Sequence, residues 1–91
     1  MKWSDFKQEI TSLTPEEKAE LDLMAAIASV RKRKNLTQAQ LARRAKVTQA
    51  QVARVENHSY APSLATLSKI LCGLDLDIAL IDRHTGEVIR I

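Results

Sequence analysis

Residues 36–57 read LTQAQLARRAKVTQAQVARVEN, and this stretch decides the fold. It is typical of two short helices joined by a tight turn at residues 46–47. Thr37 is a candidate N-cap for the first helix, because its hydroxyl can accept a hydrogen bond from an amide of the first turn. Residues 38–45 all suit a helix. Thr48 is placed to cap the second helix in the same way.

The second helix has two different sides. Val52 and Val55 are three residues apart and predict an inner side that packs on the core. Glutamine can pair with an adenine edge, arginine with a guanine edge, and a small apolar side chain can touch a thymine methyl. The other side carries those residue types, at Gln49, Ala50, Gln51 and Arg54. This pattern favours a helix that reads base edges in the major groove of DNA.

The order and spacing of residues 37–42, 47–49, Val52 and 56–57 resemble the helix-turn-helix of the Cro/phage-repressor (XRE) family. The resemblance implies that the second motif helix makes the base contacts and that an ion pair joins the motif to the preceding helix, through Arg31 and Glu56. It also implies contacts to the DNA backbone, which we predict at Thr37, Gln38, Arg43, Arg44, Lys46, Thr48 and Ser59. A plain surface loop is an equal reading of Ser59.

One position departs from the family pattern. The family usually has glycine where this chain has Lys46. That turn position often needs a positive φ, which costs a residue with a Cβ atom roughly 1 kcal/mol. Either the turn differs here or the strain is tolerated.

The basic residues are concentrated around the motif. Residues 31–54 hold eight lysines and arginines and no acid, whereas the rest of the chain holds six basic and eleven acidic residues. A run of charge is often only a solvated surface. Because this run coincides with the motif, we interpret it as a surface for DNA phosphates, which supply affinity without reading sequence.

The length and composition set limits on the class of protein. Ninety-one residues make one small domain. No apolar run is long enough to span a membrane, and the start lacks the features of a signal peptide, so we expect a cytoplasmic protein without membrane contacts. Cys72 is the single cysteine and is expected to fill the core.

We expect no enzyme activity. His58 and His84 have no neighbours at metal-ligand spacing and are expected on surface loops. There is no glycine-rich phosphate loop and no nucleophile motif, so we predict no catalytic residues, no metal and no cofactor.

Residues 1–13 form the first of three expected segments. Trp3, Phe6, Ile10 and Leu13 are spaced as one stripe of a short amphipathic helix. The stripe either folds back on the protein's own core or anchors a partner protein, because tryptophan is enriched at interface hot spots.

Residues 14–75 are expected to form a mostly α-helical DNA-binding domain that contains the motif at 37–57. Thr14 and Pro15 start a helix that should run to about Lys34, and Asn35 can end it in a left-handed cap. Ser63 caps the last helix. The residues expected to face inward are Leu23, Ile27 and Val30 in the first of these helices and Leu64, Leu67, Ile70, Leu71 and Leu74 in the last.

Residues 76–91 change to a β period. Residues 76–82 alternate as a strand, 83–86 can turn, and 87–91 can return as a second strand. A lone hairpin is barely stable and its edge is an exposed pairing template. We therefore expect a symmetric homodimer, formed through Leu76, Ile78, Leu80 and Ile81. A two-fold dimer also suits a palindromic operator in double-stranded DNA.

The two ends of the chain carry a second resemblance. The segment Leu-Asp-Ile-Ala-Leu-Ile-Asp at 76–82 is similar to the strand of HipB-like antitoxins, and the Trp3-x-Asp5 segment before a long helix looks like HigA antitoxins of HigB–HigA pairs. The resemblance implies an antitoxin that represses its own operon and neutralises a RelE/HigB-like, mRNA-cleaving toxin. We predict that the toxin binds the stripe of Trp3, Phe6, Ile10 and Leu13. The alternatives are a stand-alone XRE repressor and an interaction module that has lost DNA binding.

Overall fold

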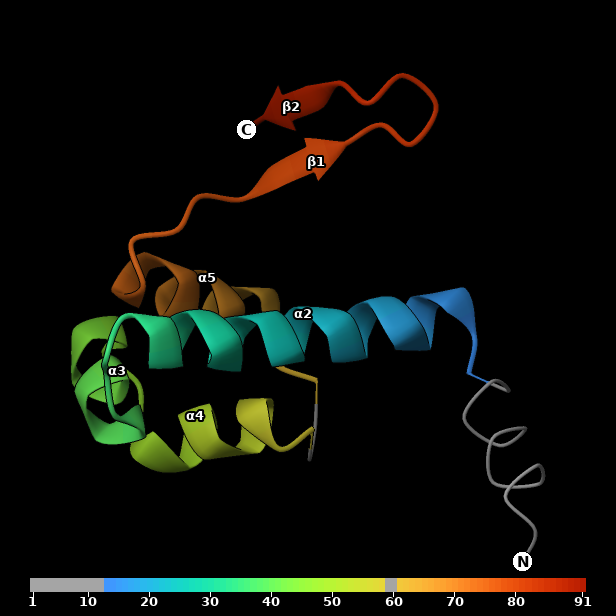
Figure 1. Cartoon of the computed structure of the whole chain (residues 1–91). Coiled ribbons are helices and arrows are strands. Elements are labelled where there is room, and N and C mark those ends of the chain that lie inside the picture. Colours follow the sequence, from blue (N-terminus) through green and yellow to red (C-terminus); the bar gives the residue numbers. More distant parts are fainter. Residues whose placement is uncertain (1–12, 59–60) are drawn as a thin grey trace, which may run out of the picture.

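The computed structural model describes residues 13–58 and 61–91 of the chain. This part is mostly helical and ends in a short β-hairpin, which confirms the predicted fold class (Figure 1). In chain order the elements are α2 (Pro15–Arg33), α3 (Gln38–Ala45), α4 (Gln49–Glu56), α5 (Leu64–Gly73), β1 (Ala79–Ile81) and β2 (Val88–Arg90). The expected N-terminal helix lies almost entirely outside the described residues.

All four described helices begin directly after the predicted hydroxyl residue. In each case the side-chain oxygen accepts a hydrogen bond from the backbone amide three residues later, and the caps are Thr14, Thr37, Thr48 and Ser63. Pro15 occupies the first position of α2, where a missing amide costs no hydrogen bond. The short side chains therefore fix where the helices start.

Three of the helices end in the same way. A residue with left-handed backbone follows α2, α3 and α5, with φ of 59° at Asn35, 59° at Lys46 and 57° at Asp75, and His58 after α4 has φ of 62° as well. The next amide then bonds back to a carbonyl five residues earlier, as Val47 does to Ala42 at 3.0 Å. This is the Schellman arrangement, in which the residue after the left-handed one packs back on the helix. Those residues are Leu36, Val47 and Leu76, and all three pack against the core.

The core lies around α3, which packs against both α4 and α5, while α2 packs against α4. Its buried residues are Met24, Ile27, Leu41, Ala42, Ala45, Val52, Val55, Ile70, Leu71 and Leu74. Gly73 lets α5 approach α3 closely, because a Cβ atom at this position would lie 3.0 Å from the Cβ of Ala45 and 3.1 Å from its nitrogen. The small residues of α3 thus set the spacing of the helices.

Three predictions about the core are wrong. Leu23 and Leu64 were expected to face inward, but they are 43% and 73% exposed. The inward side of α2 is instead set by Met24, Ile27 and Arg31. Cys72, expected in the core, is exposed.

The tail forms an antiparallel hairpin in which Leu80 pairs with Ile89 and Ile81 with Val88. The first strand is shorter than predicted, because Asp75 and Leu76 complete the end of α5 before the chain extends. Figure 1 shows the hairpin standing beyond α5, on the side of α2 opposite to α4. Its apolar side chains are exposed, namely Ile78, Leu80, Ile81, Val88, Ile89 and Ile91.

Candidate nucleic-acid interface

The outer side of α4 presents polar and small side chains. Val52 and Val55 anchor the helix in the core with 1% and 0% of their surface exposed. On the other side Gln49, Ala50 and Arg54 are exposed. A helix held by its inner valines and open along its outer side has the form required to enter a major groove.

Gln51, predicted to contact a base edge, makes a contact within the chain. Its side-chain oxygen accepts a hydrogen bond from the backbone amide of Thr48 at 2.9 Å, and the backbone amide of Gln51 donates to the Thr48 hydroxyl at 3.1 Å. These two bonds form a capping box, and Thr37 and Gln40 form a second one at the start of α3. The repeated Thr-x-x-Gln pattern was the signal in the sequence. Gln51 thus holds the start of α4 in the structure.

The predicted DNA-backbone residues lie at helix starts and on the exposed surface of α3 and its turn. Thr37 and Thr48 are caps, and Arg43 and Lys46 are exposed. Helix N-termini attract phosphates because their first amides point outward. Ser59 lies outside the described residues.

Besides the two capping threonines, Arg44 and Gln38 also have partners within the chain. Arg44 donates a hydrogen bond to the Asp75 carboxylate at 2.9 Å, and both side chains of this ion pair are exposed. Gln38 donates its side-chain amide to Glu56 at 3.1 Å. Exposed ion pairs contribute little to stability, so Arg44 can exchange Asp75 for a phosphate at low cost.

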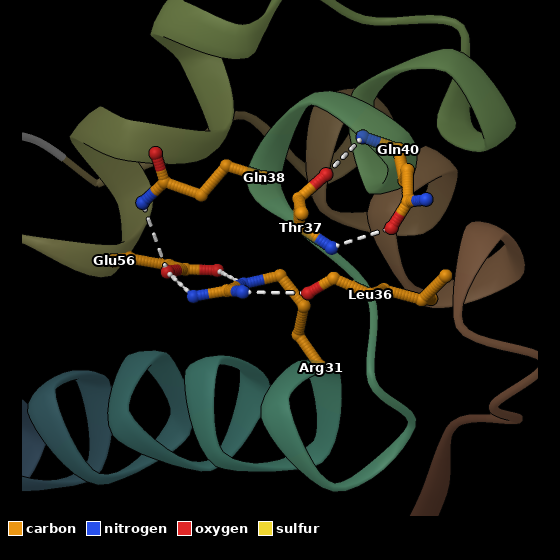
Figure 2. Close-up of polar contacts among 6 residues, drawn as sticks. All are labelled: Arg31, Leu36, Thr37, Gln38, Gln40 and Glu56. Carbon is orange, nitrogen blue, oxygen red and sulfur yellow. Dashed lines mark hydrogen bonds and ion pairs between the residues drawn. The ribbon is translucent and has the colours of Figure 1, made fainter.

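Arg31 and Glu56 are brought together at the junction of three helices, as Figure 2 shows. The Arg31 guanidinium donates two hydrogen bonds to the Glu56 carboxylate, at 2.6 Å and 2.9 Å, and a third to the carbonyl of Leu36 at 2.7 Å. Only 11% and 7% of the two side chains is exposed. This forked pair joins the end of α2 to the end of α4 and to the segment before α3.

The pair also shifts the ionisation of both groups. Burial alone would raise the pKa of Glu56, but the hydrogen bonds from Arg31 and Gln38 and the charges of Arg31 and Lys32 outweigh it, so the pKa lies below its ordinary value. The hydrogen bond to Glu56 raises the pKa of Arg31, against the effect of burial. Both groups are therefore charged at neutral pH.

The remaining predicted residues lie away from this surface. Leu13 is exposed just before α2, and Trp3, Phe6 and Ile10 lie outside the described residues. Ile78, Leu80 and Ile81 are exposed in or beside the hairpin, while Leu76 packs on the core. Within residues 13–58 and 61–91, no three His, Cys, Asp or Glu side chains gather as a metal site would require. Over the same ranges, every helix is too short or too polar to cross a membrane.

Comparison with known proteins assigns the chain to a family through the same motif. A family model described as Helix-turn-helix matches residues 27–81, which is more than half of the chain. A search of curated proteins finds no match.

Solved structures extend the likeness. The chain is similar to one in the HipA-HipB-O2-O3 complex, with 33% identity over 70% of this chain and 90% of that one and a TM-score of 0.66. It is similar to HipB in a complex with an O2 20mer, at 34% identity and the same TM-score. A chain of a toxin-antitoxin module from Streptococcus pneumoniae is 29% identical over 91% of this chain and 93% of that one, with a TM-score of 0.66. The fold is thus a helix-turn-helix DNA-binding fold of the kind that antitoxins use.

Proposed function

The chain belongs to the helix-turn-helix family, and from this we propose that it is a DNA-binding antitoxin that represses its own operon. The observation that carries the DNA-binding part is the exposed side of α4. Gln49, Ala50 and Arg54 share that side, and they fall within residues 31–54, which hold eight of the chain's basic residues and no acid. Arg54 is the residue we assign to a guanine edge, and Gln49 to an adenine edge.

The phosphates on either side of the groove are assigned to the turn and the helix starts. Lys46 follows α3 directly, and the caps Thr37 and Thr48 stand at the two N-termini. Arg43 and Arg44 are exposed near the end of α3, and we assign them to further phosphates. Gln51 stabilises this arrangement, because its hydrogen bond from the Thr48 backbone amide fixes the backbone from which Gln49 and Ala50 project.

We assign dimerisation to the hairpin. Two strands by themselves are marginally stable in water, and the hairpin exposes apolar side chains on both of its faces. Pairing with a second copy would bury Leu80 and Ile81 and cover a strand edge. The resulting two-fold axis would let two α4 helices reach half-sites one helical turn apart on a palindromic operator.

The partner we propose is a RelE/HigB-like, mRNA-cleaving toxin. Support for a toxin partner comes from the toxin-antitoxin chain of Streptococcus pneumoniae, because that likeness covers 91% of this chain and so extends beyond the helix-turn-helix. The RelE/HigB class of the toxin rests on the resemblance to HigA antitoxins at the N-terminal segment. The N-terminal stripe of Trp3, Phe6, Ile10 and Leu13 is part of the proposed contact. The alternative is a stand-alone repressor, which would need only the motif and the dimer.

Co-purification separates these two functions. The chain would be expressed with the genes that flank it, isolated by an affinity tag and examined for a bound protein. We expect a small basic protein that arrests growth when it is expressed alone and degrades mRNA. A homodimer that binds its own promoter but retains no neighbour would establish the stand-alone repressor instead.

A further inference from the structure

An apolar groove runs between α2 and α5. A cavity of about 150 Å³ is lined by Leu23 and Met24 of α2, Pro62 of the loop before α5, and Leu67 of α5, with Glu20 at its edge. A second cavity of about 280 Å³ shares Leu23 and Leu67 and continues towards the hairpin. No described residue of α4 lines either cavity, and Figure 1 shows α4 on the far side of α2.

Two leucines that the fold leaves in solvent belong to this region. Leu23 is 43% exposed and lines both cavities. Leu64 is 73% exposed and lies three residues before Leu67, which places it on the same side of α5. Exposed large apolar side chains beside a groove favour an interaction surface, since a partner that covers them removes apolar area from water.

The charge beside the groove is acidic. Glu20 lies at its edge, and Glu16 is one further turn towards the start of α2 on the same side. Lys18 lies on a different side of α2 and pairs with Asp22 at 2.9 Å. A matching surface would therefore carry an apolar side chain next to lysine or arginine.

We propose that this groove is a docking surface for the toxin in addition to the N-terminal stripe, and that it receives an apolar side chain flanked by basic residues of a basic protein. The inference rests on the proposed antitoxin function and adds the surface and the chemistry of the contact. A toxin seated between α2 and α5 would leave the outer side of α4 open. Toxin and DNA can then bind the same chain together.

The test uses the full chain and the protein encoded beside it, with binding measured by calorimetry. Leu23→Glu places a charge in the groove, and Ala25→Glu is the matched control, because Ala25 is exposed and lies about 200° around α2 from Leu23. We expect Leu23→Glu to raise the Kd for the neighbour about tenfold or more, as loss of an interface anchor does. Ala25→Glu should leave it unchanged, and neither should alter promoter affinity or Tm.

Glu20→Lys supplies an independent variant that keeps the groove apolar. It should weaken the complex at low salt, and the difference from the unaltered chain should shrink as salt screens the charges. Failure of the unaltered chain to bind its neighbour would remove the antitoxin function and the groove with it. Binding that Leu23→Glu and Glu20→Lys both leave intact would retain the antitoxin and refute only the groove. If Leu23→Glu is the only variant that lowers the Tm or dissociates the proposed dimer, the groove belongs to the protein's own fold. That result would refute the docking surface.

Discussion

Lys46→Gly is expected to stabilise the protein and to weaken its binding to DNA. Lys46 has φ 59° and ψ 42°, the left-handed conformation, at the turn between α3 and α4. This conformation costs a residue with a Cβ atom about 1–2 kcal/mol. Glycine avoids that cost but loses about 0.5–1 kcal/mol more on folding, because its unfolded chain is freer. The net gain is about 0.5–1 kcal/mol, equivalent to a rise in Tm of about 2–8 °C.

The loss in DNA binding follows from the charge. Each phosphate contact contributes about 0.9 to the slope of log affinity against log salt. Removing Lys46 from both copies of a dimer should therefore lower the magnitude of that slope by about 2. Thermal denaturation measures the first effect, and fluorescence anisotropy on promoter DNA over a salt series measures the second.

Two further variants serve as controls. Lys46→Asn removes the charge but provides a residue that tolerates this backbone, as Asn35 does at φ 59° after α2. Lys46→Arg keeps the charge and the strain, so it should match the unaltered chain in both assays. A lower Tm in Lys46→Gly would refute the strain, and an unchanged salt slope would refute the phosphate contact.

Three other changes probe the frame around the motif. Glu56→Gln should lower the free energy of unfolding at pH 7 by about 3 kcal/mol, because it leaves the Arg31 charge buried without its partner. The pKa of Glu56 in the folded protein is below its ordinary value of 4.5. The ion pair therefore stabilises the fold fully above about pH 4.5, and its contribution is lost as the pH falls through the pKa of Glu56 in the folded state. Denaturation measured across this pH range should show a smaller loss of stability in acid for the variant than for the unaltered chain. Gly73→Ala should cost about 1–3 kcal/mol in thermal unfolding, because the new Cβ atom would press on Ala45, and a stability equal to that of the unaltered chain would contradict the close contact. Leu80→Lys should convert the proposed dimer to a monomer in light scattering, and a dimer that persists would move the interface away from the hairpin.

The parts of the fold that the sequence predicted depend on local chemistry. The starts of the helices follow from Thr14, Thr37, Thr48 and Ser63, whose hydroxyls satisfy amides close by in the chain. The family pattern placed the turn at Lys46, and the structure shows that its positive φ is present and tolerated.

The wrong predictions concern residues whose burial is decided by packing between helices. Residues 21–27 of α2 are apolar apart from Asp22, so periodicity alone could not choose between Leu23 and Met24 as the inward residue. The structure buries Met24, in register with Ile27 and Arg31. Cys72 was assigned to the core from its residue type, but it lies on the outer side of α5 between two buried neighbours, Leu71 and Gly73.

The candidate site was predictable in its location and less so in its contacts. The exposed positions of Gln49, Ala50 and Arg54 follow from helical geometry once the inner valines are known. The contacts of Gln38, Arg44 and Gln51 within the chain could not be ranked against DNA contacts, because glutamine and arginine suit both.

The most direct measurement compares the unaltered chain and Arg54→Ala on DNA from the chain's own promoter and on the same DNA with its bases shuffled. We predict a clear preference for the promoter sequence. Arg54→Ala should lose about 1–3 kcal/mol of the specific binding and relax the preference at one base position in each half-site, while binding to shuffled DNA stays nearly the same. Unchanged promoter affinity and unchanged base preference in Arg54→Ala would contradict the placement of α4 in the major groove.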